Sequence, residues 1–264
     1  MRSSVSTLWQ RRHLLSVLVS SQIKRQNRGS LLGYLWWFLD PLLMTAVYYA
    51  IVVVLFTRGK GNQPFVLFLV IGLFSFKAFS DSLGQAVGAM QARAAIIKAI
   101  SFPKAVLPLG GVLANTTYFG FGLLVVICIA LLYAPQYGTW PSPAYLMLPV
   151  VIAVQIAFTV GAALIVSVLG VWYTDVRNII RHLLRLWFYL SPGLYSVSMI
   201  PERFRDLYML NPFAGLFESY RAIIMRGELP SAQHLGTASA IAVASLLAGF
   251  TIFWRVEGRI VQKL

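Results

Sequence analysis

Residues 28–43 read RGSLLGYLWWFLDPLL, a pattern that is typical of a chain entering a lipid bilayer. A basic residue, Arg28, comes first, two tryptophans follow, and an apolar run then continues to Phe56. Indole rings favour the headgroup region of a membrane, and Arg and Lys are enriched on its cytoplasmic side. The stretch therefore predicts that a membrane-spanning helix begins near residue 35.

The composition of the whole chain agrees with this prediction. The 264 residues are 58% hydrophobic and only 11% charged, with a mean hydropathy of +0.74, whereas a soluble domain carries about 25% charged residues. A net charge of +14 could indicate nucleic-acid binding. Most of the 22 basic residues flank apolar runs, however, so no nucleic-acid partner is expected. Cys128 is the only cysteine, which excludes a disulfide framework.

The sequence predicts an all-α polytopic membrane protein with a single transmembrane domain over residues 1–264. A helix needs about 20 mostly apolar residues to cross a bilayer. Six runs meet this length, at residues 35–56, 65–90, 106–133, 144–170, 179–198 and 234–254. Residues 199–233 contain two apolar stretches that are too short to span, which predicts two short re-entrant helices on the outer side. A plain outer loop is the alternative.

The distribution of Lys and Arg predicts the orientation of the chain. Basic residues concentrate in residues 1–34, in the loop 91–105, at the start of the fifth run and after residue 254, so both termini are expected in the cytoplasm. Within 1–34, Leu15, Val19 and Ile23 form one apolar stripe, which predicts an interfacial helix on the inner leaflet. The alternative is a basic leader that only fixes the topology.

Sequence patterns for covalent chemistry are absent. The chain has no G-x-x-x-x-G-K-[ST] phosphate-binding loop and no G-x-S-x-G nucleophile elbow. His13, His182 and His234 are isolated in the sequence, so no metal site is expected. We therefore predict no catalytic residue, no metal and no cofactor bound by this chain.

Three charged residues fall inside the first two apolar runs. Lys77 and Asp81 are four residues apart, hence on one face of the second predicted helix, and are expected to form an ion pair. Because intramembrane charges are costly and often functional, a proton relay is the alternative, although no acid other than Asp40 appears in neighbouring runs. Asp40 is expected to cap the first helix or to pair with an arginine.

Aromatic residues cluster in the first and fifth runs. They allow two interpretations, an interfacial belt or the lining of a path for a sugar polymer, whose flat C–H faces stack on aromatic rings. The candidates for channel lining are Tyr34, Trp36, Trp37, Tyr48, Trp187, Tyr189 and Tyr195.

Short motifs follow one another along nearly the whole chain. They are Arg28-x-Ser30-x-x-Gly33-x-x-Trp36-x-x-x-x-Pro41, Gly72-Leu-Phe with Phe79-Ser-Asp81, Phe102-Pro103-Lys104, Tyr173-x-Asp175-Val-Arg177, Phe188-Tyr-Leu-Ser-Pro192, Asn211-Pro212 and Tyr220-Arg221. In this order and spacing, the chain resembles the membrane subunit of ABC polysaccharide exporters, the O-antigen, capsule and teichoic acid permeases. Lys77 departs from that pattern, in which a neutral residue is more usual.

The resemblance implies a homodimer of six-span subunits in a bacterial cytoplasmic (inner) membrane, with two copies of a separate ATPase that binds ATP and Mg. It also implies that the loop 91–105 couples this chain to the ATPase. The residues expected to make this coupling contact are Arg93, Lys98, Phe102, Pro103 and Lys104. The residues expected to form an outer gate are Pro201, Asn211, Pro212, Tyr220 and Arg221.

The function predicted from these observations is export of a lipid-linked polysaccharide, O-antigen above all. Lys24, Arg25 and Arg28 are expected to attract the phosphate of the lipid carrier, at about 1 kcal/mol for each basic residue near a charged surface. Within the same family, capsule or teichoic acid is the alternative cargo, and a smaller drug or lipid is a further one. The alternatives from other classes of protein are a membrane-embedded transferase and a non-transporting scaffold.

Overall fold

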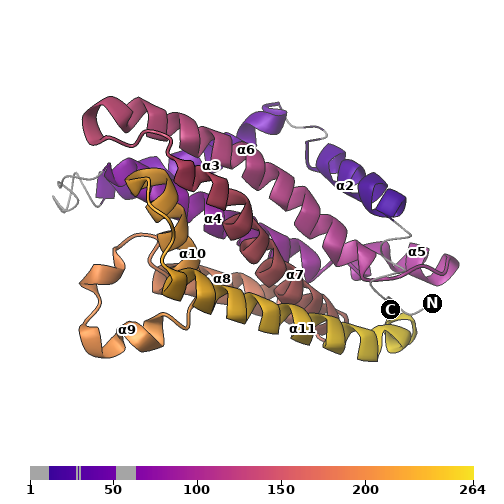
Figure 1. The fold of residues 1–264 in the computed structure, drawn as a ribbon. Helices are drawn as coiled ribbons and strands as arrows, with labels where there is room; N and C mark the ends of the chain where they lie inside the picture. Colours follow the sequence, from indigo (N-terminus) through magenta and orange to yellow (C-terminus); the bar gives the residue numbers. More distant parts are fainter. Residues whose placement is uncertain (1–11, 28, 30, 52–63) are drawn as a thin grey trace.

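The computed structural model describes residues 12–27, 29, 31–51 and 64–264, and in these residues the chain forms helices and no strand. Figure 1 shows long helices lying side by side, with short helices at both ends of the bundle. The elements are α2 (Arg12–Asn27), η1 (Gly33–Leu35), α3 (Trp36–Tyr49), α4 (Phe65–Ala86), η3 (Gln91–Arg93), α5 (Ala94–Ala99), α6 (Val106–Tyr137), η4 (Pro143–Met147), α7 (Leu148–Trp172), α8 (Val176–Leu190), η5 (Val197–Met199), α9 (Glu202–Tyr208), α10 (Pro212–Arg221), η6 (Ala222–Arg226) and α11 (Ala232–Lys263).

Four helices of the described chain are long and apolar enough to cross a membrane. They are α4, α6, the continuous η4–α7 segment and α11, and they correspond to the second, third, fourth and sixth predicted runs. The all-helical membrane fold is therefore confirmed at this level. By length and composition, α3 and α8 are not among the four.

The first and fifth predicted runs differ from the helices found there. The described part of α3 covers Trp36–Tyr49, and residues 52–56 of the first run lie outside the described residues. In the fifth run, α8 begins earlier than predicted, at Val176, and ends at Leu190 with only 15 residues. The early end has a local cause, because Pro192 disfavours a helical backbone at Ser191, whose ψ is 154°.

Helix α4 lies at the centre of the bundle, in contact with α3, α6, α7, α8 and α10. Its first half is apolar on nearly every side and is almost wholly buried, as expected of a helix surrounded by others. The two charged residues of α4, Lys77 and Asp81, lie in its second half, and their side chains are partly exposed. The second half of α4 is therefore the part that faces an open space.

Small residues let α7 and α11 lie very close together. A side chain at Gly161 would collide with the backbone of Ser245, and one at Gly249 would collide with the backbone of Gly161. The hydroxyl of Ser245 also donates to the Phe158 carbonyl at 3.3 Å. Close backbone approach over small residues is a recurrent way of packing helices in membranes, where no hydrophobic force drives helices together.

A polar cluster joins α4, α7 and α10 inside the core. Gln155 donates through Nε2 to the Ser75 carbonyl at 3.0 Å and accepts at Oε1 from the Ser75 hydroxyl at 2.9 Å. The Tyr220 hydroxyl donates to the same Oε1 at 2.9 Å. All three residues are buried, so the cluster fixes how these helices sit against one another.

The two ends of the bundle carry different elements. Helix α5 and the end of α11 lie at one end in Figure 1, whereas α9 and α10 lie at the other. At the α5 end, the backbone N–H of Lys104 donates to Oε1 of buried Glu257 at 2.8 Å. Helix α2 lies against α6, with Leu15 and Leu18 packed on the core. The predicted N-terminal helix is thus present over Arg12–Asn27, while residues 1–11 lie outside the described residues.

Candidate functional site

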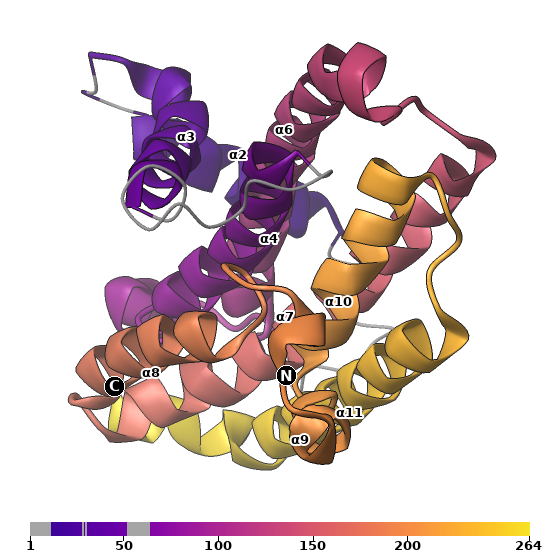
Figure 2. The same ribbon diagram turned by 90° about the vertical axis from the view of Figure 1, so that its left-hand side faces the viewer.

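Residues of α3, α4 and α8 line a groove in the bundle. Figure 2 shows where these three helices lie. The groove consists of two adjoining cavities of about 640 and 560 Å³. Both cavities share the lining residues Asp40, Lys77, Ser80, Asp81, Arg181 and Leu184. The larger cavity reaches Gln85 and Asn115 toward the α5 end, and the smaller one reaches Tyr48 and Phe188 toward the α9 end. The groove therefore follows α4 along much of its length.

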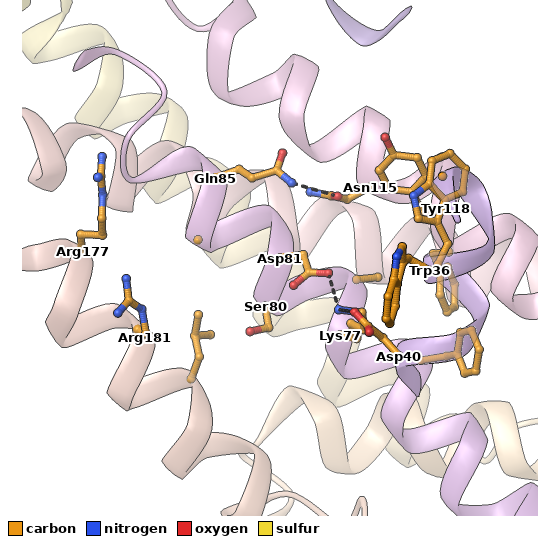
Figure 3. A pocket seen from close by; sticks show the side chains of 17 residues that line it. Trp36, Asp40, Lys77, Ser80, Asp81, Gln85, Asn115, Tyr118, Arg177 and Arg181 are labelled. Carbon is orange, nitrogen blue, oxygen red and sulfur yellow. Dashed lines mark hydrogen bonds and ion pairs between the residues drawn. The ribbon is translucent and has the colours of Figure 1, made fainter. Parts of the chain in front are cut away.

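Three charged residues meet at the middle of the groove (Figure 3). Lys77 Nζ lies 3.0 Å from Asp81 Oδ2 and 3.7 Å from Asp40 Oδ2. The predicted Lys77–Asp81 pair is confirmed, and among the described residues the partner of Asp40 is this lysine and not an arginine. The three side chains are 38% to 52% exposed, and exposed ion pairs contribute only about 0–1 kcal/mol. The link between α3 and α4 is therefore easily broken and re-formed.

Three arginines follow one face of α8 beside this cluster. Arg177, Arg181 and Arg185 are four residues apart, so they recur about once per turn. Arg177 and Arg181 line the larger cavity, and Arg181 and Arg185 line the smaller one. The face of α8 toward the core instead buries Val176, Leu184 and Phe188. We call the three arginines the arginine ladder.

A chain of hydrogen bonds joins the groove to the α5 end of the bundle. Arg93 Nη2 donates to Gln22 Oε1 at 2.9 Å, and Gln22 Nε2 donates to Gln85 Oε1 at 3.0 Å. Gln85 Nε2 then donates to Asn115 Oδ1 at 3.3 Å, a contact drawn in Figure 3. The chain crosses η3, α2, α4 and α6, and no spacing in the sequence indicates that these four residues meet.

Tyrosines lie at the opposite end of the groove. The hydroxyls of Tyr48 on α3 and Tyr189 on α8 are 3.3 Å apart. Tyr195 donates to the Tyr189 carbonyl at 3.3 Å, and Tyr208 donates to the Tyr195 hydroxyl at 2.9 Å. Burial raises the pKa of Tyr208, and its hydrogen bond to Tyr195 raises it further. Of the predicted lining residues Tyr48, Tyr189 and Tyr195, Tyr48 lines the smaller cavity, whereas Tyr189 and Tyr195 line neither of the two cavities. Tyr208 was not predicted.

The remaining predicted aromatic residues divide between groove and core. Trp36 and Trp37 line the larger cavity, and the Trp37 ring centroid lies 3.8 Å from that of Tyr118. Trp187 is not among the lining residues of either cavity. Its ring packs in the core against Phe79 and Phe213, with centroids 5.5 and 5.8 Å away. The side chain of Tyr34 lies outside the described residues.

The residues predicted for an outer gate lie at the α9 end of the bundle. Asn211 caps α10 through its Oδ1, which accepts from the Phe213 N–H at 3.1 Å, and Pro212 follows at the first helical position. Trp187 Nε1 donates to the same Oδ1 at 3.1 Å. Pro201 is exposed just before α9, whereas Tyr220 is buried in the core.

Arg221 is the largest fully buried side chain of the described residues, with 1% of its surface exposed. Its guanidinium lies 3.3 Å from the ring centroid of Phe68, and its Nη2 donates to the carbonyls of Phe68 and Gly193, each at 3.3 Å. Nη1 lies 3.4 Å from Glu218 Oε1. The side chain therefore ties α10 both to the first half of α4 and to the turn after α8.

The predicted coupling residues lie together at the α5 end but differ in exposure. Lys98 is exposed, Phe102 is half-buried and Pro103 is buried. Arg93 binds Gln22, and Lys104 binds Glu257 through its backbone. Of the predicted headgroup residues, Lys24 is exposed on α2. Arg28 and the side chain of Arg25 lie outside the described residues.

A helical bundle with four candidate spans and a charged groove between its helices defines the chain as a multi-pass membrane protein. Residues 13–225 match the ABC-2 type transporter family, and the chain belongs to it. It is therefore a multi-pass transport protein of the inner membrane.

Relatives within the family are named as polysaccharide export proteins. The chain is 36% identical to the O-antigen export system permease protein RfbA of Myxococcus xanthus over 94% of both chains. It is 30% identical to the RfbA of Klebsiella pneumoniae over 95% of both chains. It is 22% identical to the polysialic acid transport protein KpsM of Escherichia coli over 84% of this chain and 85% of the relative.

Proposed function

We propose that this chain is the permease subunit of an ATP-driven exporter that moves a lipid-linked polysaccharide, O-antigen above all, across the inner membrane to its outer side. The observation that carries the proposal is the groove of about 640 and 560 Å³ between α3, α4 and α8. Its lining combines charged residues at the middle with Trp36, Trp37 and Tyr48, which suits a polar polymer. The similarity to two O-antigen permeases supports that cargo.

The groove is open on one side, and a second copy of the chain would close it. Helix α8 exposes Ile179, Leu183 and Leu186, and α3 exposes Leu43 and Met44. Apolar faces that border a polar groove suit contact with another protomer across it. The proposed assembly is a homodimer in which two grooves form one path, with six spans per chain once α3 and α8 are counted.

An ATPase partner would bind at the α5 end. Helix α5 and the residue after it expose Ile96, Lys98 and Ile100 together, a small apolar and basic surface. This end is proposed to be cytoplasmic, with ATP and Mg held by the partner. Lys24, Arg25 and Arg28 would attract the anionic lipid carrier before it enters the groove.

Export in a cell tests this function. A strain that makes O-antigen but lacks its own ABC permease would receive this chain with its neighbouring ATPase, and surface O-antigen would be measured with an antibody on intact cells. We expect surface glycan only when both subunits are present and the ATPase is active. Glycan that stays inside the cell despite both subunits at normal levels would refute the O-antigen assignment. Capsule export in a matching strain would then support the second candidate, which the KpsM relative favours.

A further inference from the structure

The arginine ladder lacks the carboxylates that would neutralise it. In the described part of the chain, the structure gives no ion pair to Arg177, Arg181 or Arg185. The two carboxylates of the groove, Asp40 and Asp81, are already engaged by Lys77. Four cations and two carboxylates line the groove, which leaves it positively charged. Cavity-lining arginines without a carboxylate partner are available to bind an anionic ligand.

The chemistry of the ladder favours a phosphate ligand. Arginine presents its donors in a planar fork that binds phosphate oxygens in pairs. Residues four apart on a helix are separated by about 6 Å along its axis, so adjacent arginines can hold one diphosphate between them. Asn115 adds a further donor on the opposite wall, because its buried Nδ2 has no hydrogen-bond partner among the described residues.

The backbone near the α5 end makes room for the first arginine. Gly88 lies in the turn after α4, and a side chain there would collide with the guanidinium of Arg177. Figure 3 shows Arg177 and Arg181 on α8 across the groove from Asp81 and Lys77 on α4. The ladder therefore begins at the end where cargo enters under the proposed function and continues toward the tyrosines at the other end.

We propose that the arginine ladder of α8 is a binding site for a phosphate ester, namely the diphosphate that joins a polyprenyl lipid to its glycan. Arg177 receives the diphosphate, and Arg181 and Arg185 hold it as the carrier moves along the groove. The site is distinct from Lys24 of α2, which is not among the residues that line the two cavities. This inference rests on the proposed function, since it assumes that the groove is the path of the cargo.

Binding to the purified permease–ATPase complex in lipid nanodiscs tests the site without requiring transport. The probes are polyprenyl diphosphate, the uncharged polyprenol, and a glycerol phosphate oligomer that carries phosphate without the lipid. We expect polyprenyl diphosphate to bind at least tenfold more tightly than polyprenol. Arg181→Gln is expected to weaken diphosphate binding by about tenfold or more, the usual range for a hydrogen bond to a charged group, and to leave polyprenol binding unchanged.

Two variants separate charge from folding. Arg203→Gln removes an exposed arginine of α9 and is expected to bind like the unchanged protein. Gly88→Ala keeps every charge but displaces Arg177, and it is expected to weaken diphosphate binding severalfold. Binding is compared only among variants whose complexes have the same basal ATPase rate and the same elution volume in size-exclusion chromatography.

The outcomes are decisive for the site. Unchanged diphosphate binding in Arg181→Gln and in the triple Gln variant of the ladder would overturn the proposal. An equal loss of diphosphate and polyprenol binding would do the same, as would preference for the glycerol phosphate oligomer over the lipid. Failure of the proposed function would instead appear as absent glycan export by the unchanged protein in cells.

Discussion

Replacement of Arg221 by methionine tests whether one buried side chain holds the α9 end of the bundle together. Methionine fills nearly the same volume, so the change mainly removes the charged contacts and leaves no large cavity. The lost contacts are those to the carbonyls of Phe68 and Gly193 at 3.3 Å, to Glu218 at 3.4 Å and to the Phe68 ring.

The magnitude follows from burial and geometry. Removing one partner of a buried ion pair costs about 3–5 kcal/mol. The contacts of Arg221 are at the long end of hydrogen-bond distances, and Glu218 keeps Arg226 within 3.6 Å, so the lower value of about 3 kcal/mol applies. A change of 1 kcal/mol shifts the melting midpoint of a chain of this size by about 2–4 °C. The expected shift is therefore about 6–12 °C downward.

The assay heats the purified complex in steps and measures the folded fraction by size-exclusion chromatography. Arg226→Gln is the matched control, because its side chain is 39% exposed and pairs with the same glutamate. Exposed pairs contribute about 0–1 kcal/mol, which corresponds to at most about 4 °C. Arg221→Lys should fall between the two, since one ammonium group cannot reach both carbonyls while lying over the ring. A midpoint of Arg221→Met equal to that of Arg226→Gln would refute the reasoning.

Three further predictions concern the groove and its supports. Lys77→Met should lower export severalfold, because it leaves two unpaired carboxylates in the groove. Adding Asp81→Asn should restore part of the export. If surface glycan does not recover in the double variant, charge balance is not the cause. Gln22→Leu removes two hydrogen bonds of about 1 kcal/mol each and should lower the cargo-stimulated ATPase rate. Gln233→Leu, at an exposed position, is the control. Equal ATPase rates in the two variants would exclude a role of Gln22 in coupling to the ATPase. Gly249→Ala should cost about 1–3 kcal/mol by overpacking α7 against α11, while Gly236→Ala, which meets open space, should leave the melting midpoint unchanged.

Residue-level patterns predicted some parts of the site and missed others. The pair of Lys77 and Asp81 follows from a spacing of four on one helix, which is a local property. The hydrogen-bond chain from Arg93 to Asn115 joins four separate elements, so no periodicity indicates it. Trp187 was predicted for the channel, yet it packs in the core, because position in an apolar run does not determine which face of the helix meets its neighbours.

The amino-acid sequence by itself determined the class of this protein. Hydropathy over about 20 residues is a local sum, and it was sufficient to predict an all-helical membrane protein and the helices that became α4, α6, α7 and α11. The ordered motifs were sufficient to place the chain among polysaccharide export permeases, and the match of residues 13–225 to the ABC-2 family agrees.

Only the tertiary structure decided which side chains share a space. The groove exists because α3 and α8, which are far apart in the chain, lie on either side of α4. The same packing brings Asp40 to Lys77, places the arginine ladder opposite these two residues and buries Arg221. The physical reason is that contact between helices depends on the rotation of each helix about its axis. That rotation is fixed by packing with all of its neighbours together and not by the residues of one helix.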